Sequence, residues 1–345
     1  MVEKMDDRKR DILRAVTDDY ISSGEPVGSR TIARKYKLGL SPATIRNEMA
    51  DLEESGFLEQ PHTSSGRIPS DRGYRYYVDA LMQQRPMTPE EINNIRSYYE
   101  TQKEEFEGIL RQTAKILTQM TNYPSFSSAP KLSQSMLRHI QFLPLSDRNV
   151  LIILVMDSGH IEHRIMQMSQ DLESGVLEKF SNALNQQLIG KHIQDITMEC
   201  LKAIRTDLIL HDYFFDQIIK MVLEAMHSRQ KDKLFLEGAS HILEQPEFKQ
   251  IDKVKPILEL FEEEDKLYAV LTGDEVKEKI KVYIGKENDS SMSLSDCSVV
   301  TAVYDLGGQT FGKIGILGPK RMDYAKMVAM VQYVSQYLSE LIKGI

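Results

Sequence analysis

The stretch SPATIRNEMADLEESGFLEQPHTSSGRIP, residues 41–69, decides how the N-terminal part of this chain folds. Ser41 is suited to cap a first helical turn, and Pro42 fits the next position because no backbone donor is needed there. Gly56 is suited to close the helix in a left-handed conformation. Three apolar residues recur at helical spacing and are expected to face a core: Ile45, Met49 and Leu52. The sequence therefore predicts a short helix with a defined start and a defined end.

The outward face of this predicted helix changes character along its length. Its first half carries small or hydrogen-bonding residues, namely Ala43, Thr44, Arg46, Asn47 and Ala50. Its second half is acidic, with Asp51, Glu53 and Glu54. A helix that enters the DNA major groove inserts its N-terminal half, and its later turns leave the groove. An acidic second half is compatible with that geometry if it faces solvent or the domain's own basic residues.

The flanking segments complete a winged helix-turn-helix pattern. A first helix is predicted from about Asp7 to Ser23, and Ser29 is expected to cap a second helix. After Gly56, FLEQ and GRI around a polar tip predict a short hairpin at the wing position, followed by a helix from Asp71 to about Met82. Residues 27–47 hold five basic residues and no acidic one, which indicates a phosphate-facing surface: Arg30, Arg34, Lys35, Lys37 and Arg46.

Composition bounds the class of protein. The 345 residues suggest two or three domains, with 41% hydrophobic and 27% charged residues, which is ordinary for a soluble globular chain. Residues 1–85 contain 14 basic and 14 acidic residues, so the whole net charge of −8 belongs to the remainder. No apolar run is long enough for a membrane span, and no secretory signal is present. Two cysteines, Cys200 and Cys297, suggest neither a disulfide framework nor a metal site, and a cytoplasmic protein is expected.

The remainder of the chain alternates between helical and strand-like segments. Thr88 and Glu91 form a capping-box signature for a long helix to about Met120. Three strand-like runs follow, HIQFLPL, NVLIILVMD and HIEHRIMQM, and then a helix from about Ser174 to Leu188. Residues 190–257 are predicted to be mostly helical. The tail is predicted to hold a helix around Lys255, three strands and a long final helix from Arg321.

Two local patterns resemble catalytic or metal motifs but are better explained structurally. GGQTFGK, residues 307–313, lacks the Ser or Thr of a P-loop because Ile314 follows, and the segment after it is strand-like, so a hairpin turn is predicted. HIEH, residues 160–163, places two histidines on opposite faces of a strand, so they cannot bind one ion. Neither pattern argues for an enzyme.

The helix between Ser41 and Gly56 is therefore predicted to read DNA. Arg46 suits guanine and Asn47 suits adenine at their major-groove edges. The alternative from the residues alone is a small three-helix domain that binds protein.

Two long blocks resemble the family of the bacterial heat-inducible transcription repressor HrcA. They are residues 41–79 and the run DCSVVTAVYDLGGQTFGKIGILGPKRMDYAKMVAMVQYVSQYLS, residues 296–339. PVGSRTIA, residues 26–33, and IGKEN, residues 284–288, fit as well. The resemblance spans the chain and is least distinctive at residues 190–257.

The resemblance implies an α+β multidomain protein. Its expected parts are a winged helix-turn-helix domain (1–85), a linker with the start of a long helix (86–100), a GAF-like α/β domain (101–190 and 258–345) and an inserted, mainly helical dimerisation domain (191–257). It implies repression of chaperonin and DnaK operons by a homodimer bound to the CIRCE inverted repeat, release on heat stress, and maintenance of activity by the GroEL chaperonin. It implies no cofactor and no metal.

The site residues expected from the resemblance and the helix pattern fall into two groups. The base-reading group is Ala43, Thr44, Arg46 and Asn47. The phosphate and wing group is Ser29, Arg30, Thr31, Ser64, Ser65, Gly66 and Arg67. Tyr74, Tyr76 and Tyr77 are expected to pack within the domain, because duplex DNA exposes no base faces for stacking.

Two other functions stay open at this point. One is a winged-helix regulator in which a small molecule bound by the GAF-like domain sets DNA affinity. The other is a nucleotide-binding enzyme built on GGQTFGK, and a thermal shift with ATP would indicate it.

Overall fold

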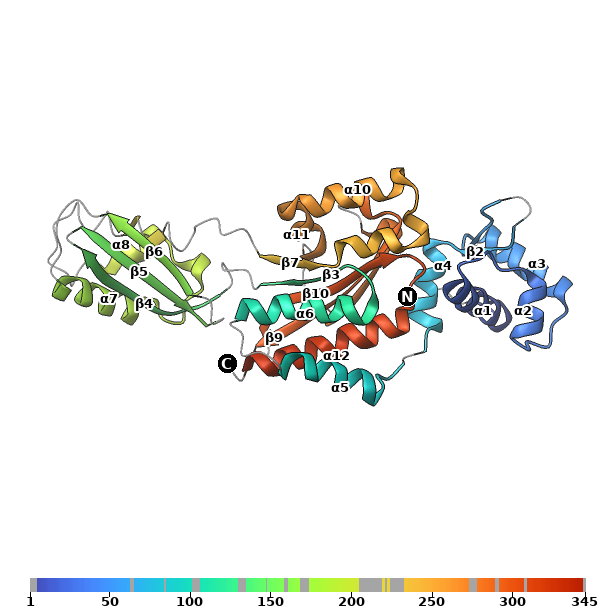
Figure 1. The fold of residues 1–345 in the computed structure, drawn as a ribbon, viewed down its shortest axis with the longest axis horizontal. Helices are drawn as coiled ribbons and strands as arrows, with labels where there is room; N and C mark the ends of the chain where they lie inside the picture. Colours follow the sequence, from blue (N-terminus) through green and yellow to red (C-terminus); the bar gives the residue numbers. More distant parts are fainter. Residues whose placement is uncertain are drawn as a thin grey trace.

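The computed structural model describes residues 5–62, 65–83, 85–100, 106–129, 135–146, 148–157, 161–167, 174–204, 219–220, 222–223, 233–272, 278–288, 292–306 and 309–343. Three units follow one another along the long axis of the molecule (Figure 1). An N-terminal helical unit lies at one end, a sheet covered by helices lies in the middle, and a smaller three-stranded sheet lies at the other end. The mixed α/β class expected from the sequence is confirmed.

The N-terminal unit contains three helices, a two-stranded sheet and a fourth helix. The helices are α1 (Asp7–Ser23), α2 (Ser29–Lys35) and α3 (Pro42–Glu54), and the strands are β1 (Leu58–Glu59) and β2 (Ile68–Pro69). Helix α4 (Asp71–Tyr76) continues into a π-helical turn, η1 (Tyr77–Leu81).

Local signals set the ends of α3 as predicted. The Ser41 hydroxyl accepts a hydrogen bond from the Thr44 backbone N–H (3.1 Å), and Gly56 adopts φ +76° just beyond the helix. Ile45, Met49 and Leu52 are buried in a core shared with α1. One prediction is corrected, because Gly28 occupies the N-cap of α2 and Ser29 is already its first helical residue.

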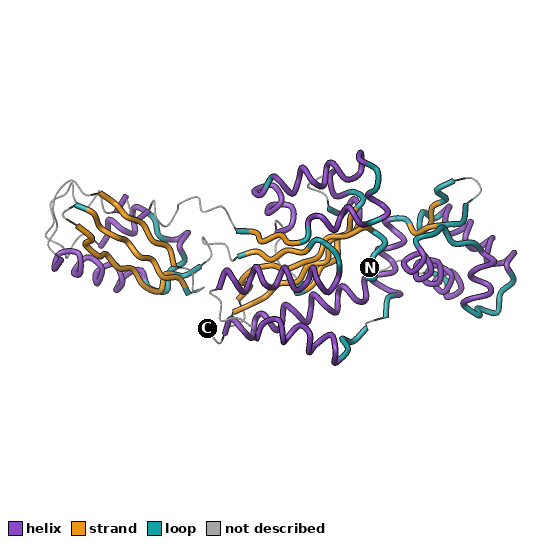
Figure 2. Tube along the Cα trace, viewed as in Figure 1, coloured by secondary structure: helices purple, strands orange, loops and turns teal. Residues whose placement is uncertain are grey.

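A five-stranded antiparallel sheet forms the central unit, in the order β7-β3-β10-β9-β8. Its strands are β3 (Ser125–Ser128), β7 (Leu234–Glu237), β8 (Ile280–Ile284), β9 (Cys297–Leu306) and β10 (Gln309–Pro319). One face is covered by α5 (Pro89–Glu100), α6 (Phe106–Thr121) and α12 (Tyr324–Lys343), and the other by α10 (Ile251–Glu262) and α11 (Glu264–Thr272) (Figure 2). Short 3-10 helices connect these elements: η5 (Ala239–Glu244), η6 (Pro246–Phe248), η7 (Gly285–Glu287) and η8 (Met292–Leu294).

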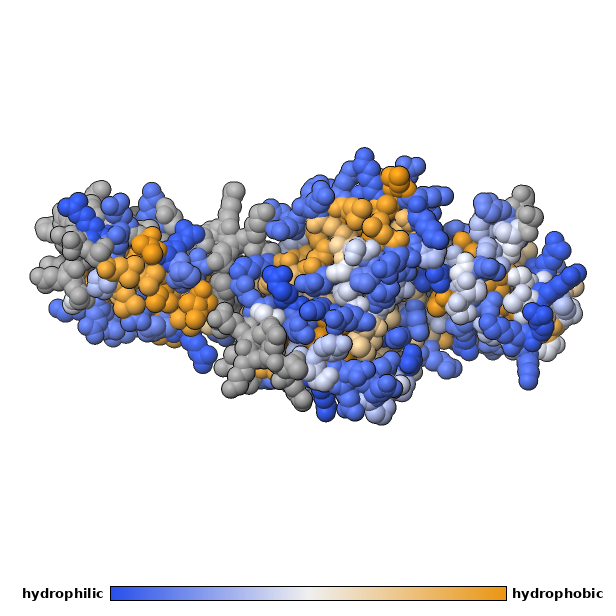
Figure 3. Space-filling model, in the orientation of Figure 1, coloured by the Kyte–Doolittle hydropathy of each residue, from blue (hydrophilic) through white to orange (hydrophobic). Residues whose placement is uncertain are grey.

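The third unit, here called the inserted unit, is a separate three-stranded sheet with helices on one side. It contains β4 (Leu137–Ser146), β5 (Asn149–Met156), β6 (Ile161–Gln167), α7 (Ser174–Leu188), η3 (Ile193–Asp195) and α8 (Met198–Ala203). These elements share an apolar core of their own. The other face of the sheet carries apolar side chains at the molecular surface (Figure 3).

The structure groups the elements differently from the predicted domain boundaries. The predicted boundaries place the three strands between Leu137 and Gln167 in the GAF-like domain, yet these strands form their own sheet. Conversely, β7 and α10 begin within the predicted inserted segment 191–257, and both pack in the central unit. The alternation of apolar and polar residues shows which face of a strand is buried but not which sheet the strand joins. The grouping of the strands could therefore not be predicted from the sequence.

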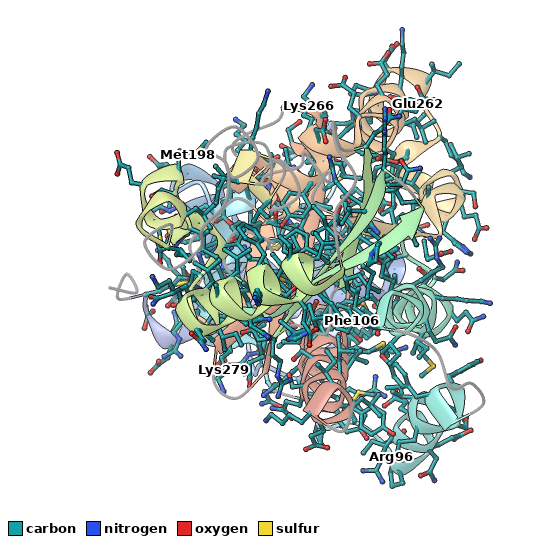
Figure 4. All side chains as sticks on the ribbon, turned by 90° about the vertical axis from the view of Figure 1, so that its left-hand side faces the viewer. Arg96, Phe106, Met198, Glu262, Lys266 and Lys279 are labelled. Carbon is teal, nitrogen blue, oxygen red and sulfur yellow. The ribbon has the colours of Figure 1, made fainter. Side chains whose placement is uncertain are left out.

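The long helix predicted from Thr88 to about Met120 is wrong. The capping box exists: the Thr88 N–H donates to Glu91 Oε2 (2.9 Å) and the Glu91 N–H donates to Thr88 Oγ1 (3.2 Å). However, α5 and α6 are two helices that pack against each other. Figure 4 labels Arg96 on α5 and Phe106 at the start of α6. The apolar periodicity continues through both helices and therefore does not reveal the break between them.

Candidate nucleic-acid interface

Helix α3 presents the first half of its outer face to solvent. Ala43, Arg46 and Asn47 are exposed, as is Ala50 one turn further on. Thr44 differs from the other three predicted base-reading residues, because it is half-buried and its Oγ1 lies 2.9 Å from Ser41 Oγ within the helix cap. The structure therefore brings Ala43, Arg46 and Asn47 together on one open surface and gives Thr44 a share in capping the helix.

The basic residues of the segment 27–47 surround this surface. All five are exposed: Arg30, Arg34, Lys35, Lys37 and Arg46. Lys35 forms an ion pair with the largely buried Asp19 of α1, and burial together with the charge of Asp19 raises the pKa of Tyr36 to about 12. The other four basic side chains make no ion pair with any residue that the structure describes. Their charges therefore remain available to an external anion.

Three acidic residues of α3, Glu48, Asp51 and Glu53, are paired with basic residues of the same unit, whereas Glu54 is exposed. Glu48 lies 3.4 Å from Arg8, and Asp51 lies 3.0 Å from Lys9, both on α1. The hydrogen bond to Asp51 raises the pKa of Lys9. These two basic residues were not singled out in the sequence, since nothing local links α1 to α3. Pairing places the acids where they do not oppose the exposed bases.

The wing is tied to both α3 and the turn before α2. The Nε of Arg67 donates a hydrogen bond to Glu53 Oε2 (2.8 Å), and Nη2 lies 2.7 Å from the same oxygen. The backbone of Arg67 pairs with that of Val27 through two hydrogen bonds of 2.9 Å. A Cβ on Gly66 would lie 2.4 Å from the Val27 carbonyl oxygen, so only glycine permits this approach. The Ser65 hydroxyl donates to the His62 carbonyl (2.7 Å) and accepts from its N–H (3.0 Å).

These contacts give several wing residues a structural role in place of the DNA contact that the sequence predicts. Arg67, expected to reach DNA, has 20% side-chain exposure and holds the wing to α3 through Glu53. Ser65 and Gly66 shape the turn. Ser64 lies outside the described residues. Ser29 and Thr31 are half-buried at the start of α2, whereas Arg30 between them is exposed.

Two further sequence features have the structural roles that the sequence predicts for them: the tyrosines of α4 and η1, and the GGQTFGK segment. Tyr74, Tyr76 and Tyr77 are 2%, 7% and 8% exposed, which confirms that they pack within the fold. The GGQTFGK segment joins β9 and β10, whose residues Leu306 and Gln309 pair across an antiparallel hairpin, so the hairpin is confirmed; Gly307 and Gly308 lie outside the described residues.

The described residues offer no metal-binding cluster and no exposed thiol beside the surface of α3. Among the described residues, no group of three or more His, Cys, Asp or Glu side chains is placed to hold a metal ion. Cys297 is buried, and its burial raises the pKa of the thiol. Within the described part of the chain, none of the helices combines the length and apolar character that a bilayer crossing requires.

Comparison with known proteins gives a consistent result. A sequence model described as "HrcA protein C terminal domain" matches residues 107–328. The chain is 42% identical to a heat-inducible transcription repressor HrcA from Desulforamulus reducens, covering 99% of this chain and 98% of the relative. It is 43% identical to the protein of the same description from Carboxydothermus hydrogenoformans, covering 98% of both. The role named for these relatives is not enzymatic.

A solved structure extends the comparison to the fold. A crystal structure described as that of a hypothetical protein matches with a TM-score of 0.62 and 20% identity, covering 99% of each chain. At this identity the likeness concerns the fold alone.

Proposed function

The chain belongs to the HrcA family of heat-inducible transcription repressors, and from that premise we propose that it represses chaperone operons by binding a CIRCE-type inverted repeat as a homodimer in the cytoplasm. One observation carries the proposal. The first half of α3 exposes Arg46 and Asn47 beside basic side chains that make no ion pair with the described residues, while Glu48, Asp51 and Glu53 of the same helix are paired within the unit. The relatives' description as heat-inducible repressors does not favour the alternative of a small-molecule sensor.

In this proposal the exposed half of α3 lies in the major groove. Arg46 donates to guanine and Asn47 pairs with adenine, while the Ala43 methyl group contacts thymine methyls. Thr44 stabilises the start of α3 through the helix cap, and the exposed part of its side chain contacts the same groove. Such contacts discriminate between bases because each pair presents its own pattern of donors and acceptors there.

Phosphate contacts in the proposal come from α2 and the wing. Arg30, Arg34 and Lys37 are exposed and make no ion pair within the described part of the chain, and Ser29 and Thr31 flank Arg30 at the start of α2. Ser65 and Gly66 lie in the wing that Arg67 holds to α3, and Ser64, outside the described residues, is proposed to contact phosphate with them. Charges of this kind fix the protein on the duplex without reading sequence.

We assign dimerisation to the outer face of the β4-β5-β6 sheet. Leu143, Leu151 and Ile165 form one cross-strand row on this face, and Ile161 pairs with Val155 further along β6 and β5. Leu143, Leu145, Ile161 and Ile165 are 36%, 52%, 57% and 65% exposed. An apolar sheet face of this kind favours burial against a second copy, which would present two α3 helices to an inverted repeat.

The same face links repression to heat and to the chaperonin. Warming that separates the dimer uncovers apolar surface, and chaperonins hold such surfaces. GroEL with ATP is then expected to return the chain to its dimeric, DNA-binding form. Binding of the inverted repeat and the sedimentation coefficient should therefore fall together on warming. A protein that stays dimeric and bound well above the heat-shock range would refute this mechanism, as would full recovery on cooling at the same rate without chaperonin.

A further inference from the structure

The N-terminal unit joins the central unit through a compact interface with an aromatic centre. Helix α4 packs on β8, and Tyr74 of α4 lies against Tyr324 at the start of α12, with ring centroids 5.8 Å apart. Both rings are fully buried. The Tyr324 hydroxyl donates to the Lys320 carbonyl (2.6 Å) and lies 2.8 Å from Ser298 Oγ, so the central unit fixes its position.

A carboxylate of α4 reaches two segments of the central unit. Asp71 Oδ1 accepts from the Lys320 ammonium (2.8 Å), and Oδ2 accepts from the Lys286 backbone N–H (3.3 Å). The carboxylate also lies directly over Gly285, where a Cβ would come within 2.3 Å of Asp71 Oδ2. Gly285 has φ +54°, a conformation that other residues rarely adopt. The site that holds the Asp71 carboxylate therefore depends on the backbone at Gly285 and Lys286 as well as on the charge of Lys320.

One turn further along α4, an arginine makes the second polar contact. Arg75 Nε donates to Glu287 Oε1 (2.8 Å), its Nη2 binds Glu287 Oε2, and the same group reaches the Val282 carbonyl. Glu287 also accepts from the Ile284 backbone N–H (2.9 Å), which orients its carboxylate. Burial alone would lower the pKa of Arg75, but the hydrogen bond and charge of Glu287 raise it, so the guanidinium stays charged.

The third contact runs in the opposite direction, from the central unit to α1. Arg321 Nη1 donates to the Ile21 carbonyl (3.0 Å) in the last turn of α1, and its Nε donates to Glu247 Oε1 (2.6 Å). The Arg321 side chain is 19% exposed. A cation at the C-terminal end of a helix meets unsatisfied carbonyls and the negative end of the helix dipole. Arg321 therefore attaches α1 directly to the central unit.

These three contacts surround the aromatic pair and leave the unit little freedom to rotate. They use residues 282–287, Glu247 and residues 320–321 of the central unit, and none of the residues that surround α3. Helices α2 and α3 lie at the far side of the N-terminal unit from this interface (Figure 1). A small rotation at the interface would therefore displace α3 markedly.

We propose that Asp71, Arg75 and Arg321 are positioning residues for operator binding, which hold the N-terminal unit in one orientation on the central unit. The proposal rests on the dimeric DNA binding described above. In a dimer this orientation sets the distance and angle between two α3 helices. Preorganisation of this kind strengthens binding to two correctly spaced half-sites and gives nothing to a single half-site.

The test measures how affinity depends on the spacing of half-sites. The probe is the inverted repeat that the full-length protein enriches from random DNA, prepared with its native spacer, with about 5 base pairs added, and as a single half-site. Because a DNA turn is about 10 base pairs, the longer spacer places the second half-site on the opposite side of the duplex. The wild-type protein should lose about 100-fold in affinity for the longer spacer.

Two variants loosen the interface in different ways. Asp71→Asn with Arg75→Ala removes charge, and Gly285→Ala displaces the Asp71 carboxylate without changing any charge. In both variants, the loss of affinity caused by the longer spacer (here called the spacer penalty) should shrink from about 100-fold to about tenfold. Affinity for the single half-site should stay as in the wild type. The control Glu107→Gln, which breaks an ion pair with Lys233 elsewhere in the central unit, should keep the roughly 100-fold loss of the wild type.

The outcomes separate this inference from the proposed function. Variants that keep the wild-type spacer penalty would overturn the inference and leave dimeric binding intact. Lost half-site affinity would also overturn it, because the residues would then support the fold of the N-terminal unit itself. A wild-type protein that does not prefer the repeat over one half-site would overturn the proposed function together with the inference.

Discussion

The N-terminal unit and the inserted unit each expose a surface that the described remainder of the chain leaves open, and the two surfaces have opposite chemistry. At the first half of α3 the exposed polar side chains include Arg46, Asn47 and nearby basic residues, and the acids Glu48, Asp51 and Glu53 are paired inside the unit. On the β4-β5-β6 sheet the large exposed side chains include Leu143, Leu145, Ile161 and Ile165, with His139, Gln141 and His163 among them. The inner face of the same sheet is buried by α7.

This difference indicates two classes of partner. Unpaired cations release counterions when they meet a polyanion, which makes binding strong at low salt and weak at high salt. An apolar sheet face gains free energy by leaving water, at about 25 cal/mol per Å², and salt affects this little. The first surface is therefore suited to DNA and the second to another copy of the chain.

The largest effect is expected from a charge placed on the apolar face. Ile165→Lys should leave the stability of the monomer unchanged, because Ile165 is 65% exposed, but should prevent dimerisation. Loss of bivalent binding should then lower affinity for the inverted repeat by about 100-fold or more. Sedimentation and operator titration on the same preparation would check this.

A matched control lies on the other side of the same unit. Lys179→Glu changes an exposed charge on α7, opposite the apolar face, and should leave both the dimer and operator affinity as they are. If Ile165→Lys remained dimeric, the assignment of the dimer to this face would be wrong.

A smaller effect is expected from α3. Arg46→Ala or Asn47→Ala should each cost about 1–3 kcal/mol in binding free energy on the operator and little on random DNA, because only base-edge contacts distinguish the two. Ala50→Ser, one turn beyond on the same helix, serves as a control with little expected change. Equal losses on both DNAs would mean that these side chains touch only phosphates.

The smallest effect should separate Arg30 from Arg67. Arg30 is unpaired among the described residues, so Arg30→Ala should flatten the dependence of log affinity on log salt by about 0.9. Arg67 is paired with Glu53, so Arg67→Ala should lower the free energy of unfolding by about 1–2 kcal/mol, as should Glu53→Gln. A salt slope that Arg67→Ala flattens, with unchanged stability, would return Arg67 to the phosphate-binding group.

The helices of the N-terminal unit are predictable from the sequence because the signals that set them are local, although the cap of α2 is at Gly28 and not at Ser29. Ser41, Pro42 and Gly56 determine the ends of α3 within a few residues of chain, and the buried stripe follows helical spacing. The exposed surface of α3 followed from the same periodicity. Such information needs no knowledge of distant segments.

What escaped prediction depends on distant partners. The strands from Leu137 to Gln167 were located correctly, but their membership of a separate sheet depends on pairing that alternation does not encode. The Arg67–Glu53 pair and the Asp71–Lys320 pair join residues 14 and 249 positions apart. No local pattern distinguishes a basic residue that binds such a partner from one that stays open to DNA.

The most direct test of the central claim compares the DNA that the wild-type and Asn47→Ala proteins enrich from a random library. The claim is that two α3 helices of a dimer read DNA through their exposed first halves. The wild type should enrich an inverted repeat, and Asn47→Ala should lose its base preference at one position in each half, at symmetric places. Enrichment of one unrepeated site by the wild type, or of the same repeat with undiminished preference by both proteins, would contradict the account.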